Sequence, residues 1–361
     1  MEDIVPEHIR SLVPYPPGKP LSELERELGV SKAIKLASNE NALGPSPKAM
    51  EAIAAALPEL HRYPDGGGFY LKRRLAAHVG VTPEQLLLGN GSNEIIELLI
   101  RTFCTPTAGV LTSECTFVVY RLISTAAGVP FTAVPMQDHT FDTDAIAERV
   151  GPDTRMVFLC NPNNPTGTMF GQSSLDRFAA KVGDDVIIVL DEAYWEYVPE
   201  QAKVDALGLL ADRPRTVILR TFSKAYGLAG VRVGYGITSP DLAEYVNRVR
   251  QPFNVNTLGQ VACQAALDDT EHVERVLSMT REGLDHISAE LKALGMTPVP
   301  TATNFVLFDT HQEAWPLYEA LLRQGVIVRP MKAYGLPNYL RVNAGTPEEN
   351  ERFLSTFREI L

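Results

Sequence analysis

Several features that define other protein classes are missing from this sequence. The 361 residues include four cysteines, and these show neither a CxxC pair nor the Cys/His spacing of a metal site, so we expect reduced thiols and no metal. No run of eighteen apolar residues occurs, and the segment MEDIVPEHIR lacks a basic region followed by an apolar stretch. We therefore expect a cytoplasmic protein with no membrane partner.

An excess of positive charge is also lacking. The chain has 33 Lys and Arg against 44 Asp and Glu, a formal net charge of -11, which argues against a broad contact with a nucleic-acid backbone. Hydrophobic residues make up 45% and charged residues 21%, as in ordinary globular proteins, which excludes disordered, collagen-like and coiled-coil classes. At about 150 residues per domain, the length predicts two domains.

Short apolar runs alternate with longer amphipathic stretches between about residues 85 and 245. This alternation is typical of repeated strand and crossover-helix units, so we predict an α/β fold with a mostly parallel central sheet covered by helices on both faces. The predicted strands are Leu86 to Leu88, Gly109 to Leu111, Phe131 to Val134, Met156 to Cys160, Val186 to Leu190, Thr216 to Leu219 and Val231 to Tyr235.

The pattern changes after about residue 251. We predict a large domain over residues 41–251, followed by a small α+β domain over 252–361. The predicted parts of the small domain are a long amphipathic stretch (258–294), strands at 304–308 and 326–328, and a last helix after Thr346. Residues 1–40 are rich in proline and include PYPPGKP, which cannot form a regular helix, so we expect an arm that packs with the small domain.

Four of the predicted strands end in unusual polar turns, where open parallel sheets bind ligands. The first turn is GNGSN (Gly89 to Asn93), which opens a helical pattern; its backbone N–H groups suit a phosphate, although a plain turn capped by Ser92 or Asn93 is an equal alternative. The second is NPNNPTG (Asn161 to Gly167), a rigid loop with three amide side chains.

The third and fourth turns carry charged groups. Asp191 closes an apolar strand and so needs a cationic partner, with Tyr194 nearby; a surface-exposed strand end or a helix cap is the alternative. Lys224 follows the last strand but one, beside hydroxyl residues and eight positions before Arg232. It could form a Schiff base while its neighbours bind an anion, although a single loop lysine is usually solvated.

Together these segments identify a family. NPNNPTG, DEAY and TFSKAYGLAGVRVGYG, in that order, resemble the pyridoxal-phosphate aminotransferases of fold type I. The segments KLASNENALGPSPKAM, HRYPDGGG, GNGSNEIIELLIRTF and IVRPMKAYGLPNYLRVNAGTPEENERF resemble the histidinol-phosphate aminotransferase family. The resemblance runs from about residue 13 to 357.

The resemblance implies a role for each residue that it matches. Lys224 would bind the aldehyde of pyridoxal 5'-phosphate covalently, and Asp191 would face the pyridine nitrogen and keep it protonated. Asn164 and Tyr194 would hydrogen-bond the phenolic oxygen, and Phe117 would stack on the ring, although Cys115 stands where the family often has proline. The implied phosphate site consists of Gly91, Ser92, Asn93, Thr221, Ser223, Arg232 and, from the other subunit of a homodimer, Tyr63.

The implied substrates are L-histidinol phosphate and the pair 2-oxoglutarate and glutamate. Arg341 matches the arginine that binds an α-carboxylate, and Arg329 lies twelve positions earlier, where a structural ion pair is the alternative role. Two arginines suit a site that accepts a phosphate monoester and a dicarboxylate in turn. Tyr15 and Asn39 match positions that close over the substrate.

Three other functions stay open at this point. An aromatic amino-acid aminotransferase is the nearest, since imidazole and phenyl rings are both flat, and a cofactor-dependent decarboxylase of a phosphorylated amino acid is the second. A non-catalytic regulator that kept the cofactor is disfavoured because the sequence has no basic tail or DNA-binding segment. A nicotinamide site is excluded because GNGSNE lacks the third glycine of that fingerprint.

Overall fold

A seven-stranded sheet is the largest element of the chain. The computed structural model describes residues 4–14, 26 and 32–361. Strand β8 runs antiparallel to its neighbours β2 and β7, and the other adjacent pairs are parallel, which confirms the predicted mostly parallel sheet. The strands, in spatial order, are β2 (Leu86–Gly89), β8 (Gly234–Thr238), β7 (Thr216–Thr221), β6 (Ile187–Asp191), β5 (Thr154–Cys160), β3 (Gly109–Ser113) and β4 (Phe131–Val134).

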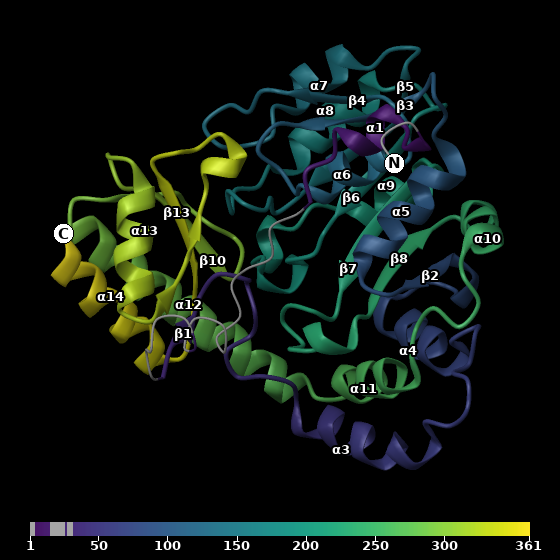
Figure 1. The fold of residues 1–361 in the computed structure, drawn as a ribbon. Coiled ribbons are helices and arrows are strands. Elements are labelled where there is room, and N and C mark those ends of the chain that lie inside the picture. The colour runs from purple at the N-terminus through teal and green to yellow at the C-terminus, as the bar shows by residue number, and fades with distance from the viewer. Residues whose placement is uncertain (1–3, 15–25, 27–31) are drawn as a thin grey trace.

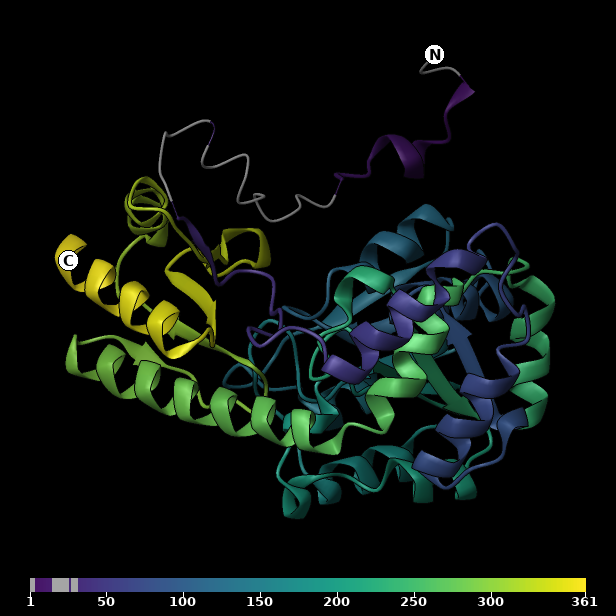
Figure 2. The same cartoon turned by 90° about the horizontal axis from the view of Figure 1, so that it is seen from below.

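Helices cover this sheet on both faces (Figure 2). Every residue of β2, β3, β6, β7 and β8 is buried, which explains why these strands are nearly continuous apolar runs rather than alternating ones. The large-domain helices are α3 (Pro47–Ala56), α4 (Phe69–Val79), α5 (Ser92–Phe103), α6 (Val119–Ala126), α7 (Thr143–Arg149), α8 (Gln172–Lys181), α9 (Ala206–Asp212), α10 (Pro240–Val249) and α11 (Thr257–Leu267).

The last predicted strand of this sheet begins later than expected. The sequence places it at Val231 to Tyr235, but the chain forms a 3-10 helix over Ala229–Val231, and β8 starts only at Gly234. Arg232 adopts a left-handed backbone conformation with φ 59°, which a strand does not allow. The apolar residues Val231 and Val233 therefore lie in a turn that aims Arg232 toward the sheet edge.

A second, smaller domain lies beside the first (Figure 1). Its sheet, in spatial order, is β12 (Arg329–Pro330), β13 (Tyr339–Asn343), β10 (Phe305–Asp309) and β9 (Thr297–Pro298). Helices α12 (Thr270–Ala293), α13 (Ala314–Arg323) and α14 (Pro347–Ile360) pack around a core of their own. The predicted last helix begins after Thr346, which caps it together with Glu349 in a capping box.

The amphipathic stretch at 258–294 divides into two helices. It is interrupted at Asp268 and Asp269, between α11 and α12. Helix α11 packs against α3 and α4, and Ala262, Cys263 and Ala266 belong to the core of the large domain. The sequence pattern assigns residues from 252 onward to the small domain. The residues of α11 instead pack with the large domain, because their apolar face meets α3 and α4.

The N-terminal arm contacts both domains. Its strand β1 (Ile34–Lys35) pairs in parallel with β11 (Val326–Ile327), and Leu36 is part of the small-domain core. Helix α1 (Glu7–Arg10) instead packs against α6 of the large domain. Within the described ranges, no helix combines the length and the apolar character needed to cross a membrane.

Candidate active site

A cavity of about 170 Å³ opens at the carboxyl ends of β5, β6 and β7. These strands are adjacent and in register, with Cys160 opposite Asp191 and Asp191 opposite Leu219. The turns that follow them therefore meet at one edge of the sheet, as the sequence predicts. The cavity is lined by Ser92, Asn93, Phe117, Cys160, Asn164, Asp191, Ala193, Tyr194, Thr221, Ser223, Lys224 and Arg232.

Lys224 lies in the turn that follows β7. Its Nζ atom donates hydrogen bonds to the carbonyl oxygens of Ser38 and Asn39, both at 3.4 Å. Burial lowers the pKa of Lys224 to about 8, and the positive charges of Arg341 and Arg232 contribute to this shift. An amine with a pKa near 8 is neutral in a useful fraction of molecules at neutral pH, and the neutral form is the one that acts as nucleophile or proton acceptor.

Asp191 is the buried carboxyl group at the end of β6, and only 2% of its surface is exposed. The Tyr120 hydroxyl donates to its Oδ2 atom at 2.5 Å, and the Ala193 N–H donates to Oδ1 at 3.2 Å. Burial raises the pKa of Asp191 to about 6, while these two hydrogen bonds and the charge of Lys224 act in the opposite direction. The cationic partner that the sequence demands is therefore present in Lys224, and a protonated pyridine nitrogen would be a second one.

An anion site lies where α5 begins. The residue before the helix, Gly91, provides no side-chain cap, so the first N–H groups of the helix, from Ser92 and Asn93, are available to a ligand. A Cβ atom at Gly91 would lie 2.3 Å from Arg232 Nη2, so only glycine lets this guanidinium approach the helix start. Arg232 Nη1 also donates to Ser223 Oγ at 3.4 Å.

The chemical groups that line the cavity fit those of pyridoxal phosphate. Amide N–H groups, the hydroxyls of Thr221 and Ser223, and the Arg232 guanidinium gather at one end of the cavity, as a phosphate dianion requires. A carboxyl group that needs a cation, Asp191, and a lysine, Lys224, lie in the same cavity, as the ring nitrogen and the aldehyde require.

Asn39 belongs to the arm but is buried beside the cavity. Its Nδ2 atom donates to the Tyr194 hydroxyl at 2.8 Å, and its backbone N–H donates to Asn343 Oδ1 at 3.1 Å. Burial raises the pKa of Tyr194 well above its usual value, so this phenol keeps its proton. Asn39 thus links the arm to both domains, and its carbonyl oxygen also accepts from Lys224 of the large domain and Asn304 of the small domain.

Arg341 links the same three parts of the chain. It lies on β13 of the small domain, and its Nη1 atom donates to Asn164 Oδ1 at 2.5 Å, in the large domain. Its Nη2 atom donates to the Ala37 carbonyl of the arm at 2.9 Å, and its guanidinium lies 4.9 Å from the centre of the Phe305 ring. The guanidinium is thereby held at the boundary of the two domains.

Two further predicted residues, Arg329 and Tyr63, lie outside the cavity lining. Arg329 on β12 is half-buried and lies directly opposite Arg341 on β13. Tyr63 is 83% exposed and stacks on Phe253 with ring centres 4.9 Å apart, so within one chain it does not line the cavity. Tyr15 falls outside the described residues.

Four residues at this site are absent from the prediction: Tyr120, Cys160, Ala193 and Asn304. Tyr120 hydrogen-bonds Asp191, and the small side chains of Cys160 and Ala193 complete the cavity wall. The spacing in CTFVVY offered a signal for Tyr120, because a helix that starts after Phe117 turns the third following residue back under it. Nothing in the local sequence indicates that Asn304 Nδ2 donates to the Asn39 carbonyl at 3.0 Å, since the two residues are distant in the chain.

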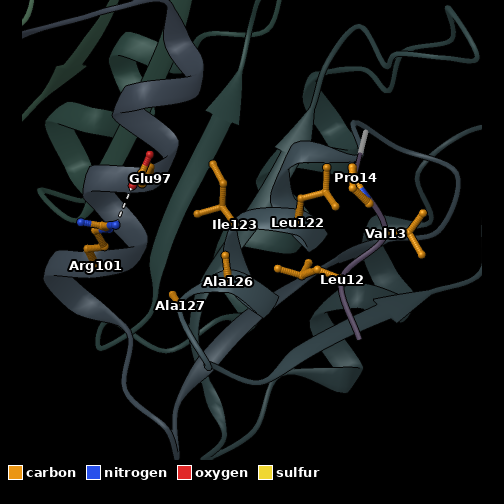
Figure 3. A pocket seen from close by; sticks show the side chains of 9 residues that line it. All are labelled: Leu12, Val13, Pro14, Glu97, Arg101, Leu122, Ile123, Ala126 and Ala127. Carbon is orange, nitrogen blue, oxygen red and sulfur yellow. Dashed lines mark ion pairs between the residues drawn. The ribbon is translucent and has the colours of Figure 1, made fainter. Parts of the chain in front are cut away.

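A larger hollow lies elsewhere. It measures about 410 Å³ and is lined by Leu12, Val13, Pro14, Glu97, Arg101, Leu122, Ile123, Ala126 and Ala127, between the arm, α5 and α6 (Figure 3). Among the described residues that line it, the charged groups are Glu97 and Arg101, which pair with each other at 2.9 Å. Among the described residues, no group of three His, Cys, Asp or Glu side chains could hold a metal ion.

Comparisons with known proteins agree with this geometry. The family described as aminotransferase class I and II matches residues 31–357. Histidinol-phosphate aminotransferase 2 of Pseudomonas aeruginosa is 48% identical over 98% of this chain and 96% of its own length. Histidinol-phosphate aminotransferase of an Anaeromyxobacter species is 48% identical over 99% of both chains.

A solved structure agrees as well. Histidinol-phosphate aminotransferase from Sinorhizobium meliloti, in complex with pyridoxal-5'-phosphate, superimposes with a TM-score of 0.90 at 28% identity, covering 99% of this chain and 98% of that one. The resemblance inferred from the short motifs is thus confirmed over nearly the whole length. The chain belongs to the class I and II aminotransferases and, within them, to the histidinol-phosphate aminotransferase family.

Proposed function

We propose that this protein transfers the amino group of L-histidinol phosphate to 2-oxoglutarate, giving imidazole acetol phosphate and L-glutamate. The observation that carries this proposal is the register of β12 and β13, which places Arg329 directly opposite Arg341. Such residues project from the same face of a sheet, so two guanidinium groups, which suit phosphate and carboxylate ligands, lie on one face of the small domain. This arrangement suits a phosphate monoester or a second carboxylate, and the names of the relatives support the same substrates.

The cofactor and the residues of this chain have separate tasks. Pyridoxal phosphate supplies an aldehyde that carries the amino group and a ring that accepts the electron pair released at the substrate α-carbon. The Lys224 amine takes the proton from that carbon, and its lowered pKa of about 8 suits the task at neutral pH. Asp191 faces the ring nitrogen, and the groups around Arg232 hold the phosphate.

The remaining residues orient the reactants. Tyr194 and Asn164, which line the cavity, would hydrogen-bond the phenolic oxygen of the cofactor, and Phe117 would cover one face of its ring. Asn39 and Arg341 hold the substrate at the domain boundary, where both already bridge the arm and the two domains. Because each of these side chains contacts more than one part of the protein, a substrate held by them lies where the arm and the two domains meet.

A single-turnover absorbance experiment tests the substrate. The cofactor-loaded protein is mixed separately with L-histidinol phosphate and with L-phenylalanine, and the spectrum of the bound cofactor is followed. We expect fast conversion to the amino form with histidinol phosphate alone. Faster conversion with phenylalanine would identify an aromatic aminotransferase, and release of carbon dioxide would identify a decarboxylase.

We also propose a cytoplasmic homodimer in which Tyr63 completes the phosphate site of the other subunit. The Tyr63 side chain supports this, because it is a large aromatic group with a polar end that is exposed in the single chain and so is accessible to a second subunit. To test it, Tyr63→Ala and Lys224→Ala chains are unfolded, mixed in equal amounts and refolded together. Each hybrid dimer then has one intact site, in the subunit that keeps Lys224 and receives Tyr63 from the other. We expect about a quarter of the native activity from a random mixture of such dimers; no gain over the two separate variants would contradict the shared site.

A further inference from the structure

Tyr120 is a fully buried side chain that the proposed function does not use. It lies in the first turn of α6, has no exposed surface and does not line the cavity, so it cannot touch a bound ligand. Its ring stacks on Phe158 of β5, with ring centres 4.4 Å apart and an interplanar angle of 18°. The Phe117 ring meets it edge-on at 5.7 Å and 86°. These two ring contacts hold the Tyr120 ring and so orient its hydroxyl.

The Tyr120 hydroxyl points to Asp191. The hydroxyl donates to Asp191 Oδ2 at 2.5 Å, while the Ala193 N–H donates to Oδ1 at 3.2 Å. With one hydrogen bond on each oxygen, the plane of the carboxylate is fixed. Burial raises the pKa of Tyr120 well above its usual value, so the hydroxyl remains a donor throughout the physiological pH range.

The charge state of Asp191 also depends on the Tyr120 hydroxyl. The titratable groups that face Asp191 are Tyr120 from α6, Cys160 from β5, Glu192 and Tyr194 beside it in the chain, and Lys224 after β7. Burial favours the neutral carboxyl group, and the donors that oppose burial are the Tyr120 hydroxyl and the Ala193 N–H, helped by the charge of Lys224. Among the groups that favour the ionised carboxyl group, the Tyr120 hydroxyl therefore contributes most.

We propose that Tyr120 is a positioning residue that holds the Asp191 carboxylate ionised and oriented toward the ring nitrogen of the bound cofactor. The Tyr120 ring also contacts the Phe117 ring, so one buried side chain supports both Asp191 and Phe117, the two residues expected to contact the pyridine ring. This inference rests on the proposed function because it needs Asp191 to face that nitrogen.

Binding of pyridoxamine 5'-phosphate to the cofactor-free protein tests the proposal without any turnover. This probe has no aldehyde, so its affinity reports the phosphate, ring and nitrogen contacts without a covalent bond to Lys224. For Tyr120→Phe we expect affinity about tenfold to a hundredfold weaker at pH 7, as for the loss of a hydrogen bond to a charged group. We also expect the pH at which affinity declines on acidification to move upward by about one unit.

Two control variants separate the possible outcomes. Tyr226→Phe removes a hydroxyl from another buried tyrosine whose charged neighbours do not include Asp191, and it should leave both the affinity and the pH profile unchanged. Asp191→Asn should bind weakly, without the pH step that Asp191 causes. If Tyr120→Phe instead behaves like Tyr226→Phe while Asp191→Asn binds weakly, the proposal for Tyr120 is wrong and the proposed function stands.

The remaining outcomes are equally decisive. If Asp191→Asn keeps native affinity and pH dependence, the role of Asp191 is wrong, and that of Tyr120 is wrong with it. Should Tyr120→Phe not fold, Phe158→Leu keeps the hydroxyl but removes the ring that immobilises it. That variant should move the pH profile in the same direction, and an unchanged profile would overturn the proposal.

Discussion

The floor of the cavity and the domain boundary beside it are built in different ways. The cavity floor (Asp191, Thr221 and Lys224) comes from the ends of β6 and β7, two adjacent strands of one sheet, and from the turn after β7. The residues of the domain boundary, which we call the seam wall (Asn39, Arg329 and Arg341), lie outside the cavity lining and come from the arm and the small domain. The floor is therefore assembled when the large domain folds, whereas the wall exists only when three separate parts of the chain are packed together.

This difference assigns different tasks to the two regions. Ligand groups at the floor meet a rigid edge, where backbone hydrogen bonds between strands set the spacing of Asp191 and its neighbours. Ligand groups at the wall meet side chains that bridge the domains, such as Arg341 between Asn164 and the arm. We infer that the floor sets the chemistry, while the wall recognises the substrate. Four variants test this division.

The largest effect is expected at the floor, from Lys224→Ala. The variant loses the amine that moves the substrate proton, and we expect the transamination rate to fall at least about a thousandfold. Its melting temperature should not decrease, because the buried charge is removed as well. Lys181→Ala, at a surface lysine that pairs with Asp144, is the matched control and should keep full activity. An active Lys224→Ala variant would refute the central role of this residue.

The next effect is expected at the wall, from Arg341→Leu. Loss of a charge-assisted contact to the substrate should reduce kcat/KM by about tenfold to a hundredfold, with a large share in KM. Arg341→Lys keeps the charge but not the two-pronged geometry and should recover only part of the loss. Steady-state kinetics with both amino donors measures this. Native KM values in Arg341→Leu would show that the wall does not bind substrate.

A smaller effect is expected from Asn39→Ala. The substitution removes the hydrogen bond to Tyr194 and places alanine at φ 56°, which costs about 1 kcal/mol of stability. We expect kcat/KM to fall about tenfold, in keeping with a lost contact at the seam. Asn39→Gly removes the same side chain without backbone strain, so it should show the same kinetic loss with a smaller decrease in melting temperature. Equal melting temperatures for the two variants would contradict this.

The smallest effect concerns the stability of the floor. Because burial raises the pKa of Asp191 from 3.8 to about 6, the ionised group opposes folding of the cofactor-free protein above pH 6, and this opposition disappears as the pH falls to about 4. Asp191→Asn should therefore raise the melting temperature by about 2–4 °C at pH 7 and leave it unchanged near pH 4. A lower melting temperature at pH 7 would show that the ionised carboxylate stabilises the fold.

The sequence predicted the floor far better than the wall for a physical reason. Strand-end motifs such as DEAY and TFSK carry their own spatial information, because adjacent parallel strands bring their carboxyl ends to one edge. The wall has no such rule. Arg341 and Asn164 are 177 positions apart in the chain, and their contact depends on how two cores are packed against each other.

The same reasoning explains the misplaced elements. An apolar run such as VRV at 231–233 fits a strand by composition, yet the left-handed conformation of Arg232 delays β8 to Gly234. Likewise, α11 continues the helical pattern of the predicted small domain, but its apolar face is buried against α3 and α4. Periodicity identifies which face of an element is apolar without identifying what will cover it.

By itself, the sequence determined the fold class, the order of the elements, the family and the residues that line the floor. These follow from periodicity and from short motifs whose chemistry is local. The tertiary structure alone decided that Tyr120 holds Asp191, that Asn39 and Arg341 bridge three parts of the chain, and that burial brings the pKa of Lys224 to about 8 and that of Asp191 to about 6. Hydrogen bonds between distant residues and the loss of solvent around a charge depend on packing in three dimensions, which neighbouring residues in the chain do not encode.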